Sequence, residues 1–448
     1  MQSKRCGVTG LLAGIALVVA SSTGASEVSG EASSANQVLE WNQIFIDTLI
    51  ATNTANSSSQ RLGAIVHTAI FDAHNGIEQR YTPIFFVNND DPRGASRRAA
   101  VIAAAHTALV GLFPARQEDL DSRYAASLAS LRGKCEKRLH FADRRRSCLE
   151  RIEHGIAWGI VVAQAVLAWR ASDGFGATYP AFTGGNAIGQ WRPTPPAFGP
   201  MSAQGLAFTT MFVLSSNTQF RPGPPRGLTT ASYVDDFNAV KALGRNTGST
   251  RTDDQTALAV FWEGNASVHW NQAANQMALA NHLSMSACNR LLAVLNIAMA
   301  DTAFTTWSGK RFYGADANQV TWRPVTSIPL ADTDGNAQTA AEPGWLPLIN
   351  TPSHPEYPAG HPSLNGAAAT VLVKYFRGAQ QTFTLTTTGQ PNRTYSSIAQ
   401  ARSDGNSGRV WGGMHYPSTV RISDAEGQAI ANYVNRNSMQ KLRRADRN

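Results

Sequence analysis

Three separated segments of this chain carry cationic or histidine side chains flanked by Gly or Pro. The segments are 307–324, 355–361 and 409–415, and the side chains are Lys310, Arg323, His361, Arg409 and His415. Arginine presents fork-shaped donors, lysine supplies a point charge, and histidine can bind a central atom or move a proton. Any one segment would arise easily by chance. Together they predict a site for a tetrahedral oxyanion.

The second segment is a loop in which two prolines and a small-residue pair precede His361. Pro358 holds the residue before it in extended geometry, and Gly360 lets another group approach the backbone closely. An apolar run over 364–373 follows and predicts a helix. We therefore expect a rigid loop that presents His361 and the Gly360 N–H group at a helix N-terminus, where anions bind well.

The elements that must position these residues are mainly helices, because apolar residues recur at helical spacing along most of the chain. Predicted helices cover 38–51, 60–77, 97–113, 116–131, 143–171, 231–243, 253–263, 269–283, 284–307 and 424–441. Polar and apolar residues alternate within 376–397, which predicts a small β-hairpin near 380–397. The predicted fold class is all-α.

The composition changes over 172–224 to Gly, Pro, Asn and aromatic residues. Long loops of this kind are usually lids over a pocket or linkers between units. We place a boundary near residue 200, between an N-terminal helical region, 26–200, and a C-terminal helical domain, 201–448.

The first residues have the pattern of a secretory signal peptide. Lys4 and Arg5 precede an apolar segment, 11–20, and small residues over 21–25 follow. We predict a signal peptide over 1–25 and a secreted or periplasmic protein. No later segment has the roughly 18 uninterrupted apolar residues of a spanning helix, so we expect no integral membrane segment after signal removal.

Cysteine usage agrees with export. Cys135 and Cys148 bracket a charged segment, which an exported protein can close with a disulfide. Cys288 lies in an apolar helix and is predicted to be a buried free thiol. The formal charge of +8 is spread along the chain without a long basic tract, so we expect no nucleic-acid partner.

Arg323 followed by Pro324, Gly360 followed by His361, and Arg409 six residues before His415 form a recognisable order. On these residues the chain resembles the vanadium-dependent haloperoxidase branch of the phosphatidic acid phosphatase type 2 superfamily. The resemblance implies two helical bundles. It also implies bound vanadate in a peroxidase, or a phosphate ester in a phosphatase.

The resemblance also implies roles for the site residues. His415 would bind vanadium, or attack phosphorus in a phosphatase, and His361 would act as acid and base. The anion would be held by Lys310, Arg323, Gly360 and Arg409.

The chain departs from the family pattern at several positions. Lys310 lies farther before Arg323 than is usual, so either an insert loops out or no lysine serves. Ala359 stands where a serine hydroxyl commonly contacts the anion, and a glycine separates Ser407 from Arg409. The carboxylate expected shortly after His415 is replaced by Thr419. Asp424 or Asp301 is the alternative partner that could orient a histidine.

Two residues bear on the choice of substrate. Trp307 has the spacing from Lys310 that the haloperoxidases use for a halide-side tryptophan. His354 resembles the histidine that bromide-oxidising members of this family have at the corresponding position. Alternatively, Trp307 simply ends a buried helix and His354 is an ordinary loop residue.

The leading prediction is therefore a vanadate-dependent haloperoxidase that oxidises halide, with bromide favoured, to hypohalous acid with hydrogen peroxide. The second is a soluble exported acid phosphatase with a histidine nucleophile, because vanadate and phosphate share shape and charge. The third is a helical binding protein with a decayed site.

Overall fold

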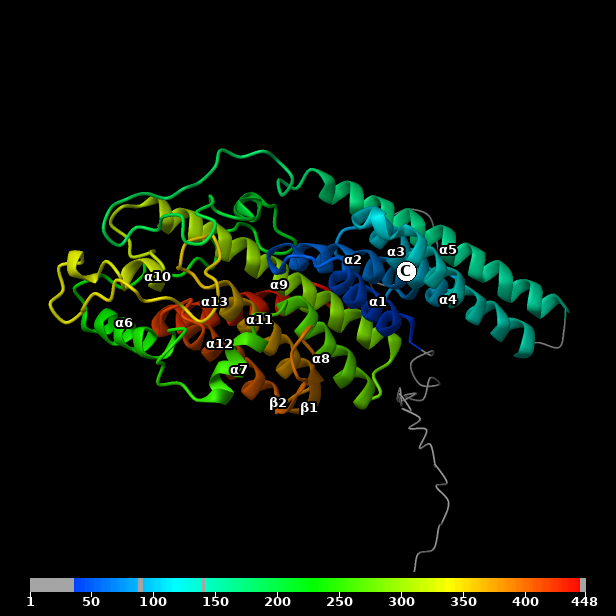
Figure 1. Ribbon diagram of the computed structural model, residues 1–448. Coiled ribbons are helices and arrows are strands. Elements are labelled where there is room, and N and C mark those ends of the chain that lie inside the picture. Colours follow the sequence, from blue (N-terminus) through cyan, green and yellow to red (C-terminus); the bar gives the residue numbers. More distant parts are fainter. Residues whose placement is uncertain (1–35, 88–91, 139–141, 444–448) are drawn as a thin grey trace, which may run out of the picture.

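The computed structural model describes residues 36–87, 92–138 and 142–443. The predicted signal peptide, 1–25, lies outside these residues. Within them the chain is helical apart from short turns, loops and one two-stranded sheet. The predicted all-α class with a small hairpin is therefore confirmed (Figure 1).

The described helices before the long loop lie close to the predicted ranges, except that α4 continues well past its predicted end at residue 131. They are α1 (Gln37–Ala51), α2 (Asn56–Glu78), α3 (Arg97–Leu112), a short 3-10 turn (Pro114–Arg116), α4 (Gln117–Arg138) and α5 (Ala142–Ala171). Side-chain caps define two of the starts, since Asn36 accepts from the Val38 N–H group and Ser96 from that of Ala99.

Glycines on α5 let it approach α3 closely. A Cβ atom at Gly155 would lie 2.4 Å from the Ser96 carbonyl oxygen, and one at Gly159 would lie 2.4 Å from that of Ala100. Among the described helices, the segment 143–171 is the one that by length and composition could cross a membrane, with 33% of its most apolar window buried. In this structure that helix packs on α3 through its glycines.

The C-terminal helices surround a long central one. They are α6 (Ala231–Leu243), α7 (Asp253–Phe261), α8 (Ala266–Ala280), α9 (Met285–Ala315), α10 (Pro324–Ser327), α11 (Gly360–Tyr375), α12 (Ile398–Trp411) and α13 (Pro417–Asn437). The helix predicted over 424–441 begins earlier, because Pro417 supplies a favourable first helical residue. Helix α12 was not predicted.

Helix α9 continues past its predicted end at residue 307 because two glycines fit against prolines of the next segment. A Cβ atom at Gly309 would lie 3.0 Å from Pro358, and one at Gly314 would lie 2.7 Å from Pro355. Lys310 is therefore a buried helical residue and not part of a loop.

The predicted hairpin consists of β1 (Gln380–Leu385) and β2 (Arg393–Ser397), paired antiparallel. Phe383 faces Tyr395, and both are buried. Tyr395 accepts a hydrogen bond from the Trp262 indole at 3.0 Å. The hairpin thus packs onto the helical core at one edge of the molecule.

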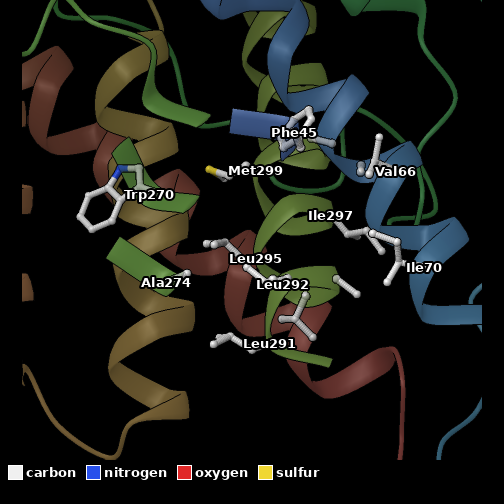
Figure 2. Close-up of a cluster of buried hydrophobic side chains, with 14 of the residues drawn as sticks. Phe45, Val66, Ile70, Trp270, Ala274, Leu291, Leu292, Leu295, Ile297 and Met299 are labelled. Carbon is white, nitrogen blue, oxygen red and sulfur yellow. The ribbon is translucent and has the colours of Figure 1, made fainter. Parts of the chain in front are cut away.

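One hydrophobic cluster continues from the first helices into the second half of the chain. Figure 2 shows its centre, where α9 lies between α8 and α2. The labelled side chains are Phe45, Val66, Ile70, Trp270, Ala274, Leu291, Leu292, Leu295, Ile297 and Met299. Helix α9 is therefore the element on which both halves pack.

The segment 172–224 contains little regular structure apart from a 3-10 turn (Gln204–Phe208). It is fastened to the segment before α11, because the Ser202 N–H group donates to the Ser353 carbonyl at 2.7 Å. The Ser202 carbonyl accepts from the Trp307 indole at 3.2 Å. The loop therefore covers the C-terminal part of α9. The boundary near residue 200 falls within this loop and stays a prediction.

Cys135 on α4 and Cys148 on α5 form the disulfide expected from the sequence, with their Cα atoms 6.0 Å apart. Cys288 is a buried free thiol whose sulfur accepts from the Asn36 amide at 3.1 Å. Helices α4 and α5, which carry the disulfide, lie at the end of the elongated molecule away from α6 and α10 (Figure 1).

Candidate active site

His415 lies in the turn between α12 and α13, where Gly413 has a positive φ of 75°. Its Nδ1 atom lies 2.9 Å from Glu356 Oε1. The same carboxylate accepts from the Tyr416 N–H group at 3.1 Å and from the Thr419 hydroxyl at 2.9 Å. Glu356 is therefore the buried carboxylate that orients His415, a role that the sequence did not reveal.

The two aspartates considered for this role have other partners. Asp424 pairs with Arg402 and accepts from Asn406. Asp301 accepts from the backbone N–H groups of the covering loop, at Phe212 and at the two residues after it. Neither carboxylate is a partner of His415, and that part of the sequence interpretation is wrong.

The partners of His415 determine the state of its ring. Its Nδ1–H group donates to Glu356, and its Nε2 atom lies 3.1 Å from Arg323 NH1, which can only donate. Desolvation, and then the nearby positive charges, hold the pKa of His415 well below its ordinary value. The neutral ring therefore directs a lone pair on Nε2 toward Arg323.

Arg323 occupies the N-cap position of α10 and is fully buried. It donates to the carbonyl oxygens of His354 at 2.9 Å and Met414 at 2.8 Å, and to His354 Nδ1 at 2.8 Å. Burial lowers its pKa to about 9, opposed by the charge of Glu356. The guanidinium therefore remains charged at neutral pH and fixes His354 and His415 on either side of itself.

Lys310 and Arg409 are also buried. Lys310 Nζ donates to the Pro355 carbonyl at 2.6 Å and to the Glu356 carbonyl at 3.3 Å. Desolvation, and then the charge of Arg323, lower its pKa well below the ordinary value. Arg409 donates to the Trp262 carbonyl at 3.3 Å, and its Nε atom has no partner among the described residues.

The start of α11 has the predicted form. Ala359 is its N-cap residue and provides no side-chain hydrogen bond, so the helix depends on other acceptors at this end. A Cβ atom at Gly360 would lie 3.2 Å from the Trp307 ring. His361 is the second residue of the helix, and its Nε2 atom lies 3.2 Å from the Gly264 carbonyl oxygen. Donation to that carbonyl leaves a lone pair on Nδ1.

The two residues assigned to the halide side are in contact. The ring centroids of Trp307 and His354 are 5.3 Å apart, and Lys310 Nζ lies 5.9 Å from the Trp307 ring centroid. Desolvation, and then the charges of Lys310 and Arg323, hold the pKa of His354 well below its ordinary value. A neutral imidazole therefore stands between the indole and the guanidinium.

Direct contacts link Lys310, Arg323, His354 and His415, whereas Arg409 and His361 contact backbone carbonyl oxygens of the segment 262–264. Arg323 contacts His354 and His415, and Lys310 joins this group through the backbone of 355–356. Arg409 lowers the pKa of His361 through its charge, second to desolvation. The cysteine pair is the predicted feature that lies elsewhere.

The donors in this site fit an oxyanion. Burying several cations is costly unless an anion compensates them. Here three cations are buried, one of them with an unpartnered N–H group, and the first turn of α11 adds backbone N–H groups. His415 Nε2 offers a neutral nitrogen ligand. The residues present are therefore suited to hold vanadate or phosphate.

Comparison with known proteins agrees with this geometry. Residues 290–444, which contain all of the predicted anion-site residues, match the family model of the VCPO second helical-bundle domain. Over these residues the chain is similar to the vanadium haloperoxidases. The curated vanadium chloroperoxidase of Curvularia inaequalis is 26% identical over 204 residues, which cover 38% of this chain and 32% of that protein.

Solved structures of vanadium haloperoxidases share the fold. A bacterial vanadium-dependent iodoperoxidase superposes with a TM-score of 0.71 and 21% identity, covering 92% of this chain and 97% of that chain. A holo-type bacterial vanadium-dependent chloroperoxidase has a TM-score of 0.62 and 17% identity, covering 85% and 92% of the two chains. The similarity to these haloperoxidases therefore extends beyond the matched domain to most of the helical fold.

Proposed function

We propose that this protein is a vanadate-dependent haloperoxidase that uses hydrogen peroxide to oxidise halide, with bromide as its preferred halide. The observation that carries the proposal is the state of His415. Its Nδ1 atom is engaged by Glu356, and its Nε2 lone pair lies beside a charged arginine. A neutral nitrogen ligand next to fixed cations is what covalent binding of an oxyanion requires.

Each residue then has a definite task. His415 Nε2 holds the anion, and Glu356 keeps the correct tautomer of the ring. Lys310, Arg323 and Arg409 balance the negative charge. Vanadate, when bound, activates hydrogen peroxide toward halide. The Nδ1 atom of His361 accepts a proton from the incoming peroxide, because its Nε2–H group is engaged by Gly264.

The preference for bromide rests on the surroundings of Trp307. His354 packs against this indole and is held in place by Arg323. A histidine at this position accompanies bromide oxidation in the family that the sequence resembles. In a variant with phenylalanine at this position, His354→Phe, we expect activity to shift from bromide toward chloride, measured as the ratio of kcat/KM for the two halides.

We also propose that the protein is exported. The signal-like segment 1–25 and the disulfide between Cys135 and Cys148 support this, because such bonds persist in oxidising compartments.

One assay tests the proposed activity. The purified protein is incubated with vanadate, hydrogen peroxide and bromide, and in parallel with a chromogenic phosphate ester without vanadate. Vanadate-dependent bromination is expected. In His415→Ala it should disappear while the circular dichroism spectrum is unchanged, and full activity in that variant would contradict the assignment.

The same His415–Glu356 pair could also activate a histidine nucleophile, which keeps an acid phosphatase as the second candidate. Hydrolysis of the ester without bromination would favour that function. Neither activity would indicate a helical binding protein whose site has decayed.

A further inference from the structure

A cavity of about 1180 Å³ lies among the N-terminal helices and the first turn of α9. It is bordered by the last turn of α2, by the first turns of α3, α5 and α9, and by part of α4. Its lining includes the buried apolar side chains of Ala95, Leu131 and Ile152. The disulfide between Cys135 and Cys148 forms part of one wall.

The charge around this cavity is strongly positive. Two acidic residues line it, Glu78 and Asp143, against six basic ones. The basic lining residues are Arg80, Arg97, Arg98, Lys134, Arg144 and Arg151. Three helix N-termini at its border add partial positive charge. An excess of about four positive charges over an apolar floor favours an anion with an apolar body.

Several polar groups of the lining already have partners, and one buried nitrogen has none. Glu78 is already engaged, because its carboxylate accepts from Arg97 at 2.9 Å and from the Ser286 hydroxyl. His74 is 1% exposed and lines the cavity, and its Nε2 atom has no partner among the described residues. Desolvation lowers the pKa of His74 to about 4, so the ring is neutral at pH 7. Its unpartnered nitrogen suits a polar atom of a bound molecule.

We propose that this cavity is a second binding site, which takes an organic polyanion with a flat or compact apolar body. The apolar floor would cover the body of the ligand, and the arginines and the lysine would pair with its negative groups. Because arginine pairs well with sulfonate-like, carboxylate and phosphate oxygens, the shared chemistry is several oxyanion groups on one apolar frame.

The cavity is independent of the candidate active site. Ser286, in the first turn of α9, lines the cavity, and Lys310 belongs to the anion site near the other end of the same helix. At about 1.5 Å of rise per residue, the two ends are roughly 36 Å apart. Failure of the proposed haloperoxidase activity would therefore leave this inference standing, and the reverse also holds.

Fluorescence titration of the whole protein with 1,3,6,8-pyrenetetrasulfonate tests the proposal, because this probe carries four sulfonates on a flat apolar frame. We expect saturable binding. The double variant Arg80→Gln/Arg98→Gln should weaken it at least tenfold. The matched control Arg393→Gln/Arg421→Gln removes the same charge from residues that do not line the cavity, and should change the affinity less than twofold.

Equal weakening by the two double variants would show general charge attraction and would overturn the proposal. So would the absence of saturable binding to the wild-type protein.

A second measurement needs no variant. Amide hydrogen exchange of the wild-type protein is compared with and without the same probe. We expect slower exchange around 95–98 and 284–286, and no change around 358–361. Protection confined to 358–361 would place the probe in the anion site and refute a second site.

Discussion

At the residue scale, the two ring nitrogens of His415 have separate partners. Glu356 engages Nδ1, and Arg323 lies beside Nε2. A carboxylate behind a ligating histidine fixes the tautomer and raises the basicity of the other nitrogen. In the proposed function, Glu356 is therefore a positioning residue that acts on the anion through His415.

The variant Glu356→Gln tests this role. The amide keeps the size of the side chain and removes its charge, so we expect vanadate to bind about 10 to 100 times more weakly. The readout is equilibrium binding of vanadate without peroxide or halide, together with the thermal unfolding midpoint. The matched control is Glu153→Gln, whose side chain is 58% exposed and pairs with Arg132. If Glu356→Gln bound vanadate as tightly as the wild type, the proposed role of Glu356 would be wrong.

The cationic and histidine residues of the candidate site were predicted because Gly or Pro flanks them in three segments and because their order resembles that of a known family. Glu356 was not predicted, although it lies inside the predicted loop. Its role depends on contact with His415, which lies 59 positions away in the chain, and a local sequence pattern cannot indicate such a contact. The signal available in the sequence was the placement of the Glu356 carboxylate between Pro355 and Pro358.

At the element scale, α12, which the sequence analysis did not predict, has several small residues on its buried face. In α12, Ala401, Gly405 and Gly408 are buried, and Gly405 packs against Trp262. Small residues contribute little to a hydropathy pattern, so no helical period of apolar residues indicates this helix. The contact between α3 and α5 is of the same kind, because Gly155 and Gly159 place backbone against backbone.

A pair of glycine variants tests this packing. Gly159→Ala would place a methyl group 2.4 Å from the Ala100 carbonyl oxygen, so we expect a loss of about 2 to 3 kcal/mol in the free energy of unfolding. Gly133→Ala is the control, because a Cβ atom at this position of α4 meets nothing within 4 Å. It should gain up to about 1 kcal/mol from helix propensity. Urea unfolding measures both, and a neutral Gly159→Ala would show that α5 can shift away.

At the scale of the whole molecule, buried ionisable groups make stability depend on pH. Glu426 is buried and accepts from Thr306 at 3.0 Å and from Ser363 at 2.8 Å. Desolvation raises its pKa to about 7 from 4.5. Between these values the folded protein holds a proton that the unfolded chain has released. The contribution of Glu426 to stability therefore falls as pH rises from about 4.5 to about 7.

The variant Glu426→Gln has no titrating carboxyl group at this position, so its stability should not fall with pH for this reason. Relative to the wild type, its free energy of unfolding should rise with pH over this window, by on the order of 2 to 3 kcal/mol. Urea unfolding of both proteins at pH 4.5, 6 and 8, in buffers of equal ionic strength, measures the difference. A difference that stays constant with pH would show that the carboxyl group titrates normally.

Lys310 and Arg323 of the candidate site donate hydrogen bonds mainly to main-chain carbonyl oxygens. Lys310 donates to the carbonyl of Pro355, and Arg323 to those of His354 and Met414. Every amino acid carries a carbonyl group, so substitutions at 355 or 414 change side chains without deleting these acceptors. The arrangement therefore tolerates sequence drift around its charged residues. This tolerance is compatible with the same helical fold in a solved bacterial structure of 21% identity.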